Sequence, residues 1–264
     1  MRSGAEKMGI QRDRAVMSVI AGIGWITQTE YGCVMKELRR PYSNMGSLRS
    51  ELQDDSVLSY PVKGFGKYDL VSKMTCCVCA LAHHDAGMSY SRSQKQDVGI
   101  LGTNSDGCLQ SNLDFFEDFV ANGRTLGRAK FFVYTLPSIP VAEAAIHFKF
   151  RGPVLYVGSP EKRVPSLSRQ SDGMIRRGES EAMLAVSASE EDAQCFVLRG
   201  ERNAPADRVL GLEEVIDVAE RKSSVEEMTG ALAEIWRQIA RIVRRSWRRR
   251  QLQRQPGLAR RSGG

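Results

Sequence analysis

The chain has 264 residues, 42% of them hydrophobic and 26% charged, which is enough for one large or two small globular domains. This composition excludes a fibrous or wholly disordered chain. It contains no run of about 18 apolar residues, and its first residues lack the apolar segment of a secretion signal, so we expect a cytoplasmic protein. Six cysteines are too few for a disulfide scaffold, and we interpret them as free thiols.

The formal net charge of +7 is unevenly distributed. Residues 237–264 contain ten arginines and no acidic residue, so the rest of the chain is mildly acidic. A body of this charge does not support a nucleic-acid-binding face across the fold, although the sequence as a whole is basic.

The first third of the chain contains a buried strand and a buried helix. Residues 1–16 are polar and patternless, which predicts a flexible arm, with Met17 as the start of the folded part. Residues 19–24 are continuously apolar and end in glycine, as a strand covered on both faces does. A polar, turn-rich stretch covers 41–68. From 69 to 86 apolar residues recur at three- and four-residue steps and stop at Gly87, which predicts a helix with a glycine C-cap.

Strands and helices alternate through the next part of the sequence. Strands are predicted at 98–102, 154–157, 182–186 and 195–198, and helices at 113–123, 137–148 and 167–177. This order predicts an α/β domain with a mainly parallel mixed sheet covered by helices, over 17–200. Residues 201–264 are expected to form a helical, arginine-rich extension.

Four segments of this domain together carry a family resemblance. They are the strand Ile20–Gly24, the helix from Tyr68-Asp69 to Asp85-Ala86-Gly87, the strand and turn from Val98 to Gly107, and the helix from Thr135 to Arg151-Gly152-Pro153. In this order they resemble the N-terminal half of β-ketoacyl synthases, the condensing enzymes of fatty-acid and polyketide synthesis. The resemblance implies a thiolase-like half domain and is closest to the small synthase-like proteins called chain-length factors.

The resemblance also makes a statement about chemistry. In an active synthase the strand after Gly-Pro leads to a nucleophilic cysteine at a tight turn before a helix. Counting through this sequence places Glu161 at that position. A carboxylate cannot form the acyl thioester that a thiolate forms, so no catalytic residue is predicted.

Synthases also use two histidines from a C-terminal half, which polarise the thioester carbonyl and assist decarboxylation. The three histidines here, His83, His84 and His147, all precede the nucleophile position. The resemblance therefore implies a non-catalytic subunit, with no cofactor or metal, that pairs with an active ketosynthase or with itself. An acyltransferase using Ser159 or Ser166 is an alternative, but no base is evident beside either serine.

The resemblance further implies where a partner binds. In the family, the strand before the nucleophile pairs with its mate across the dimer axis. The corresponding partner interface here consists of Val154, Leu155, Tyr156, Val157 and Gly158. An acyl carrier protein is a further expected partner, because it is acidic and would be attracted to the basic tail.

Several smaller motifs have a structural and a functional interpretation. Cys76, Cys77 and Cys79 with His83 could suggest a zinc site, but adjacent helix positions diverge by about 100°, and we favour a buried helix face. The pair His83-His84 is interpreted as cations at a helix C-terminus, and His147 as a packing residue. Residues 102–107 are interpreted as a strand-to-helix turn, because they lack the lysine of a phosphate-binding loop.

The C-terminal segment predicts an amphipathic helix, because Leu232, Ile235, Trp236, Ile239 and Ile242 recur at helical spacing between arginines. Three interpretations remain open: packing on the body or a partner, contact with an anionic membrane, and nucleic-acid binding, which is the least favoured. A membrane-surface or scaffolding protein is thus the alternative function. The residues predicted to contact a membrane or an acidic partner are Trp236, Arg241, Arg244, Arg245, Trp247 and Arg248.

Overall fold

The computed structural model describes residues 18–253, apart from 105, 126, 159 and 205–208. The predicted flexible arm at 1–16 and the start at Met17 lie outside the described residues. The other boundaries differ from the predicted ones by a few residues. For example, α3 begins at Leu109 and α6 at Arg163, each four residues earlier than predicted.

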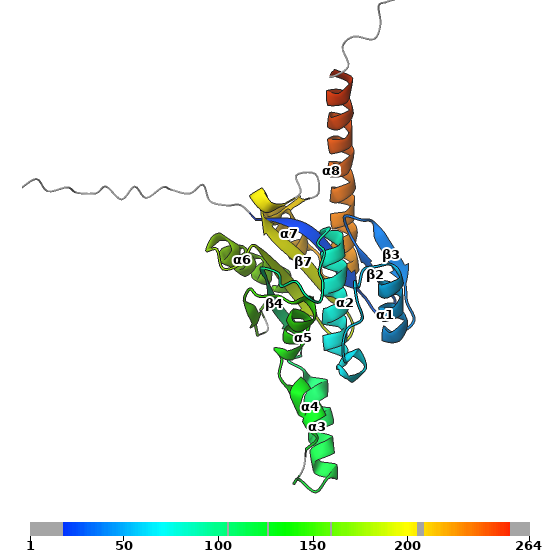
Figure 1. Cartoon of the computed structure of the whole chain (residues 1–264), viewed down its shortest axis with the longest axis vertical. Coiled ribbons are helices and arrows are strands. Elements are labelled where there is room, and N and C mark those ends of the chain that lie inside the picture. Colours follow the sequence, from blue (N-terminus) through cyan, green and yellow to red (C-terminus); the bar gives the residue numbers. More distant parts are fainter. Residues whose placement is uncertain (1–17, 105, 126, 159, 205–208, 254–264) are drawn as a thin grey trace, which may run out of the picture.

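The centre of the molecule is a mixed eight-stranded sheet (Figure 1). Along the sheet the strands are β3 (Leu38–Pro41), β2 (Glu30–Cys33), β1 (Ser18–Ile26), β7 (Ala193–Gly200), β6 (Ala182–Ala188), β4 (Val98–Asn104) and β5 (Val154–Tyr156), and β8 (Leu210–Gly211) also pairs with β1. Within the described strands, parallel pairing is confined to β4 with β5 and with β6. The predicted α/β fold with a mixed sheet is confirmed, but the expectation of mainly parallel pairing is wrong. Five of the seven pairings between the described strands are antiparallel, because β2–β3 and β6–β7 are joined by short turns and β1 pairs antiparallel with β2, β7 and β8. Strand β5 is left with one unpaired edge.

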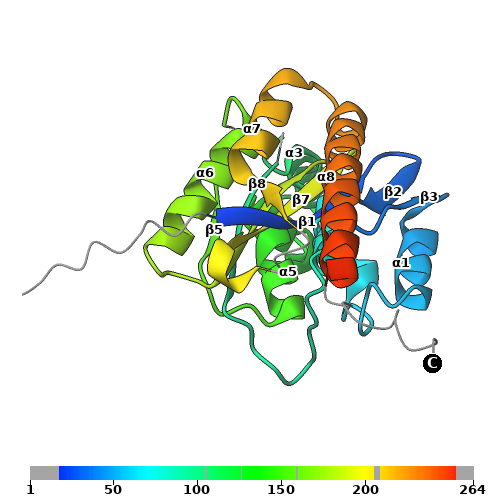
Figure 2. The ribbon, with the colours of Figure 1, turned by 90° about the horizontal axis from the view of Figure 1, so that it is seen from above.

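Helices cover both faces of this sheet, as the view from above shows (Figure 2). The helices are α1 (Met45–Asp54), α2 (Leu70–Asp85), α3 (Leu109–Ala121), α4 (Ala129–Phe132), α5 (Ile139–Phe148), α6 (Arg163–Arg176), α7 (Leu212–Arg221) and α8 (Val225–Gln253), with short 3-10 turns at Phe65–Lys67, Val133–Thr135 and Glu201–Asn203. One core cluster joins α1, α2 and α5 to one face of the sheet. The other joins α6, α7 and the first turns of α8 to the opposite face.

Successive side chains along the central strands point to opposite faces of the sheet, and this explains why there are two cores. In β6, Leu184 and Val186 pack toward α2, whereas Met183 and Ala185 pack toward α6. All four side chains are buried, so the strand is continuously apolar in sequence. A sheet covered on both faces is the reason that short apolar runs, rather than alternating ones, predicted its strands.

Helix α2 lies unusually close to β1. A Cβ atom added to Gly22 would lie 2.5 Å from the Ala82 carbonyl oxygen, and one added to Gly24 would lie 2.6 Å from the Ala82 nitrogen. Glycine is required at both positions because any side chain would push the helix off the sheet. The predicted C-terminal glycine of α2 is confirmed, because Gly87 adopts a left-handed φ of 64°.

The region expected to be polar and turn-rich contains ordered structure. Helix α1 begins there with a capping box at Asn44, whose Oδ1 accepts hydrogen bonds from the Gly46 and Ser47 nitrogens. Only Leu48 and Leu52 of this helix are buried, so its sequence carries little apolar periodicity. The β2–β3 hairpin was also not predicted.

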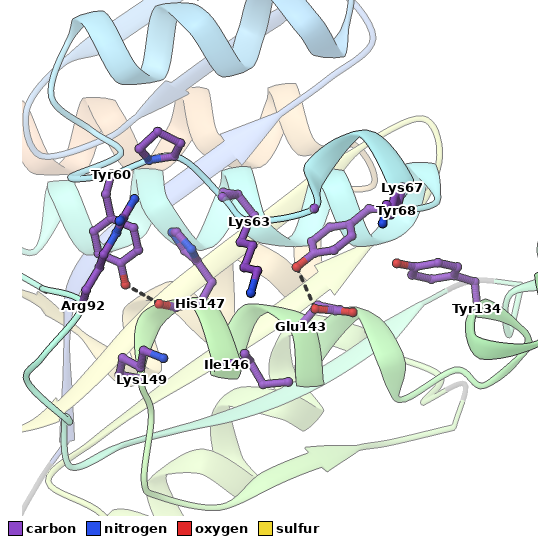
Figure 3. Close-up of a pocket in the computed structure, with 13 residues that line it drawn as sticks. Tyr60, Lys63, Lys67, Tyr68, Arg92, Tyr134, Glu143, Ile146, His147 and Lys149 are labelled. Carbon is purple, nitrogen blue, oxygen red and sulfur yellow. Dashed lines mark hydrogen bonds between the residues drawn. The ribbon is translucent and has the colours of Figure 1, made fainter. Parts of the chain in front are cut away.

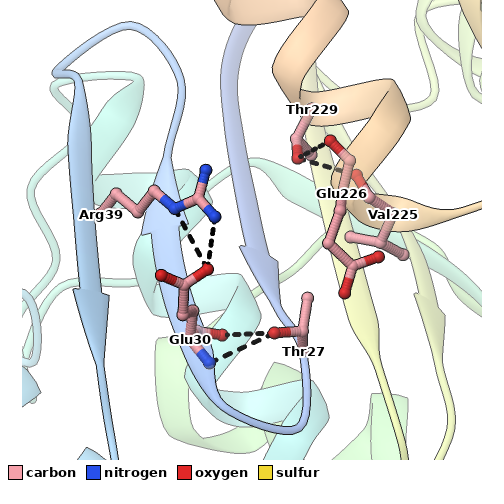
Figure 4. Close-up of polar contacts among 6 residues, drawn as sticks. All are labelled: Thr27, Glu30, Arg39, Val225, Glu226 and Thr229. Atoms are coloured by element: carbon pink, nitrogen blue, oxygen red, sulfur yellow. Dashed lines mark hydrogen bonds and ion pairs between the residues drawn. The ribbon is translucent and has the colours of Figure 1, made fainter.

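Polar contacts stabilise that hairpin and, separately, the start of α8 beside it (Figure 4). The Arg39 Nε donates to Glu30 Oε2 at 3.1 Å, and this ion pair lowers the pKa of the Glu30 carboxyl. The Thr27 hydroxyl donates to the Glu30 carbonyl oxygen at 3.2 Å and closes the turn before β2. The start of α8 faces the hairpin, and its Thr229 hydroxyl donates back to the Val225 carbonyl oxygen at 2.7 Å.

The first part of the predicted C-terminal extension packs against the domain rather than extending from it. Strand β8 pairs with β1, and Leu232 and Trp236 of α8 are buried in the second core. The later turns of α8 project away from the sheet, on the side opposite to the α3–α4 projection (Figure 1). Among the described helices no single one is long and apolar enough to cross a membrane, although the bent pair Ala129–Thr135 and Ile139–Phe148 passes the same test together.

Candidate functional site

Glu161, the residue predicted to stand at the family's nucleophile position, lies in the connection between β5 and α6. Strand β5 ends at Tyr156 and α6 begins at Arg163, with Glu161 two residues before the helix. The Glu161 side chain is exposed, and it forms no hydrogen bond or ion pair with the part of the chain that the structure describes. A helix N-terminus favours a negative charge, so a carboxylate is a stable occupant of this position.

Glu161 borders a cavity of about 430 Å³ between the start of α6, the α7–α8 connection and the β6–β7 turn. The polar groups around it include Lys162, Asp192, Glu220 and Lys222. Its lining contains neither cysteine nor histidine within the described chain. The arrangement offers no thiol–imidazole pair, which a condensing site needs for acyl transfer.

A thiol does lie in the adjacent cavity, at the carboxyl ends of β4 and β6, and it was not predicted. Cys108 lines this cavity of about 540 Å³ together with Asn104 and Arg163. Burial raises the pKa of the Cys108 thiol to about 11, so it is protonated near neutral pH. A protonated thiol is a poor nucleophile. No sequence pattern distinguishes Cys108 from the other cysteines.

The three histidines lie elsewhere, on α2 and α5. His83 is fully buried and stacks on Phe148 and Phe150, with ring centroids 5.3 and 5.4 Å apart. Burial lowers the pKa of His83 to about 4 and also lowers the pKa of His84. The interpretation of this pair as helix-end cations is therefore wrong, because desolvation favours the neutral imidazole. His147 is buried against Tyr60, which confirms its packing role.

The three clustered cysteines belong to the core. Cys76, Cys77 and Cys79 are fully buried in α2, and burial raises the pKa of each thiol. All six cysteines are free in the structure, as predicted. The cluster thus packs as small apolar side chains.

The predicted partner strand lies at the free edge of the sheet. Val154 and Leu155 expose 39% and 45% of their surface, and β5 pairs on one side only, with β4. The Val157 carbonyl oxygen accepts a hydrogen bond from the Thr103 hydroxyl at 2.7 Å, which ties the end of the strand to β4. A groove of about 470 Å³ joins Val154 to Ile146 of α5, which is 65% exposed.

A second apolar surface lies on α3, in the projection formed with α4 (Figure 1). Leu109, Leu113, Phe116 and Val120 form a stripe along this helix and are each at least 41% exposed. The projection is itself ordered, because Arg128 Nε donates to the buried Asp118 at 2.6 Å. A stripe of this kind on a folded projection is typical of a binding surface.

Of the residues predicted to contact a membrane or an acidic partner, the structure buries one and exposes another. Trp236 is only 6% exposed, and its Nε1 donates to the Met35 carbonyl oxygen at 3.0 Å, so it belongs to the core and is removed from the predicted contact. Arg241 is exposed. The side chains of Arg244, Arg245, Trp247 and Arg248 lie outside the described part, although their backbone is helical.

Comparison with known proteins supports the fold. No protein-family model matches the sequence. No curated protein matches it either. Similar solved structures include a β-ketoacyl synthase from Burkholderia phymatum STM815, with a TM-score of 0.55 and 16% identity over 72% of this chain and 60% of that one. The ishigamide ketosynthase/chain length factor has a TM-score of 0.52 and 12% identity over 71% of this chain and 63% of its own.

A third similar structure is a type II polyketide synthase acyl-carrier protein in complex with its ketosynthase. It has a TM-score of 0.51 and 11% identity, over 73% of this chain and 61% of that chain. The present chain thus spans about three fifths of the length of these structures. The predicted resemblance is confirmed for the fold, which is thiolase-like and of the ketosynthase type.

Proposed function

We propose that this chain is a non-catalytic, chain-length-factor-like subunit that acts beside an active ketosynthase in fatty-acid or polyketide biosynthesis. The observation that carries the proposal is the lining of the cavity at Glu161. The fold is of the ketosynthase type, but the described residues around this cavity include neither a thiol nor an imidazole. Without these groups, the described residues around this cavity cannot carry an acyl group as a thioester or stabilise the enolate formed by decarboxylation.

The free edge of β5 supports pairing with a partner. An unpaired strand edge with exposed Val154 and Leu155 presents backbone donors and acceptors as well as apolar area. The α3 stripe adds further apolar surface. A stable interface buries at least about 1,000 Å² in total, and strand pairing at β5 together with a helix face can supply an area of this size.

The ketosynthase is favoured as the partner because one subunit must supply the missing nucleophile and bases. A ketosynthase and chain length factor share an assembly in one of the similar structures, and an acyl-carrier protein binds its ketosynthase in another. We extend both relationships to this chain, with Val154–Gly158 as the strand at the subunit boundary. The acyl carrier protein contacts the assembled pair.

Co-expression with the ketosynthase encoded nearest to this chain tests the proposal. We expect the two proteins to elute together, and Leu155→Glu to abolish co-elution because it places a charge at the paired edge. Ile242→Glu is the matched control, since Ile242 is 67% exposed on α8 and is not part of the sheet edge. Separate elution of the unsubstituted proteins contradicts the proposal, as does equal loss with both variants.

A membrane-surface role is a distinct outcome of the same purification. Removal of residues 243–264 deletes eight of the ten arginines in 237–264 and leaves Leu232 and Trp236 in the core. Sedimentation of the full chain with anionic vesicles, lost on this truncation, together with no binding to the ketosynthase, would favour the scaffold.

A further inference from the structure

A pocket on the α2–α5 face of the molecule is separate from the cavity at Glu161. It has a volume of about 690 Å³, within the range of small-molecule sites, and lies between the 60–68 loop, Arg92 and the outer side of α5 (Figure 3). None of the residues around Glu161 lines it. A ligand bound here would thus contact none of the residues around Glu161.

The charge of this pocket is strongly positive. Its cationic side chains are Lys63, Lys67, Arg92 and Lys149. None of these four forms an ion pair with another described residue. The pocket contains one carboxylate, Glu143, whose Oε2 accepts a hydrogen bond from the Tyr68 hydroxyl at 2.6 Å. Four cations converging on one concave surface attract an anion.

Three of the four cations, Lys63, Arg92 and Lys149, lie toward the His147 end of the pocket, whereas Lys67 lies beside Tyr68 (Figure 3). Arg92 stacks over the Tyr60 ring, with its guanidinium carbon 5.1 Å from the ring centroid, and Lys149 lies on the same side. Lys63 extends into the space between His147 and Glu143 (Figure 3). An arginine with two lysines presents both the planar fork and the point charges that bind phosphate oxygens.

The packed ring of His147 forms part of the wall at this end of the pocket. The residue is 7% exposed, and its Nε2 has no hydrogen-bond partner among the described residues. Burial, and then the charges of Lys149 and Arg92, lower the pKa of His147 to about 4. The ring is therefore neutral near pH 7, and the charge at this end of the pocket comes from the lysines and the arginine.

The opposite end of the pocket is aromatic. The rings of Tyr68 and Tyr134 lie 6.2 Å apart at an angle of 53°, and both face the carboxylate of Glu143. Tyrosine rings offer flat apolar surface to a planar group. The Glu143 carboxylate has remaining lone pairs that can accept a hydrogen bond from a ring amine.

We propose that this pocket binds a small planar organic phosphate, with its phosphate at Lys63, Arg92 and Lys149 and its ring against Tyr68 and Tyr134. The two ends thus recognise different parts of one molecule. Because the pocket shares no residue with the cavity at Glu161, this binding is independent of the proposed subunit function.

Calorimetric titration of the full chain with AMP and with riboflavin 5′-phosphate tests the proposal. We expect at least one of them to bind with a dissociation constant below about 1 mM. Adenosine lacks the phosphate and inorganic phosphate lacks the ring, so each should bind at least about tenfold more weakly than the complete ligand, because each loses one end of the site.

Substitutions locate the site. Lys63→Gln and Arg92→Gln should each weaken binding by about tenfold or more, because each removes a charge-assisted hydrogen bond. Lys130→Gln removes the same charge from the exposed surface of α4 and should leave binding unchanged. The proposal is overturned if neither phosphate binds below 1 mM, if adenosine binds as tightly as AMP, or if Lys130→Gln weakens binding as much as Lys63→Gln.

Discussion

Replacing Asp85 by asparagine should destabilise the fold by about 2–4 kcal/mol, because this carboxylate joins three segments of the chain. Asp85 is 1% exposed, and its Oδ2 accepts hydrogen bonds from the Ile23 nitrogen at 2.8 Å and the Met35 nitrogen at 3.1 Å. Its Oδ1 accepts a third bond from the Lys36 nitrogen at 2.8 Å. Burial raises the pKa of Asp85, while these backbone donors oppose the rise.

The magnitude follows from what an amide can replace. Asparagine keeps one carbonyl oxygen, so at least one backbone N–H faces an NH₂ group and loses its acceptor, at about 1–3 kcal/mol. The other bonds lose the charge that strengthens them, which adds roughly 1 kcal/mol. The Met35 carbonyl oxygen also accepts the Trp236 hydrogen bond, so the docking of α8 should loosen together with the β2–β3 turn.

Urea unfolding followed by circular dichroism measures this change. Asp54→Asn is the matched control, because Asp54 is exposed at the end of α1, and we expect it to change the unfolding free energy by less than about 0.5 kcal/mol. An Asp85→Asn protein within 0.5 kcal/mol of the unsubstituted chain would refute the reasoning, because the three bonds would then contribute nothing net.

Three further predictions concern stability at acid pH, the docking of α8 and the residue at position 161. The folded-state pKa of His83 is about 4, against about 6.5 in the unfolded chain, so the unfolded chain binds more protons between these pH values. Lowering the pH from 7.5 to 5 should therefore reduce the unfolding free energy by about 2 kcal/mol through this residue. Urea unfolding at a series of pH values should show that His83→Gln reduces the dependence of the unfolding free energy on pH, and an unchanged dependence contradicts the assignment. Trp236→Phe should lower the unfolding free energy by about 1–2 kcal/mol in the same assay, because the buried Met35 carbonyl oxygen loses its hydrogen-bond donor. The control Arg237→Gln removes an exposed ion pair and should lower it by less than about 0.5 kcal/mol. Equal losses for the two variants would mean that this end of α8 does not pack on the body. Glu161→Cys should yield a thiol that iodoacetamide alkylates but no condensing activity, because no imidazole lines the cavity, and ketone formation by this variant would overturn that assignment.

The sequence predicted best where burial produces a pattern along the chain. The core strands are apolar runs because both faces of the sheet are covered, and α2 carries the apolar spacing of a buried helix that stops at Gly87. Helix α1 was not predicted because only Leu48 and Leu52 of it are buried, and the β2–β3 hairpin was not predicted because its strands have four residues each and β3 has no buried residue. Their hydrogen bonds come from capping and from strand pairing, which leave little trace in hydropathy.

Side-chain environments were predictable only where neighbours in sequence determine them. His83 stands beside His84 at a helix end, as a helix-end cation would, yet Phe148 and Phe150 from a distant segment enclose it. The cationic pocket likewise combines Tyr60, Arg92 and His147, which are far apart along the chain. Such sites arise from tertiary packing, which no local motif records.

The most direct test of the central claim is a condensation assay on the purified chain alone, supplied with malonyl and acyl thioesters of an acyl carrier protein. The account predicts no elongated β-keto product without the ketosynthase, and product when the ketosynthase is added. Formation of the elongated ketone by this chain alone would contradict it.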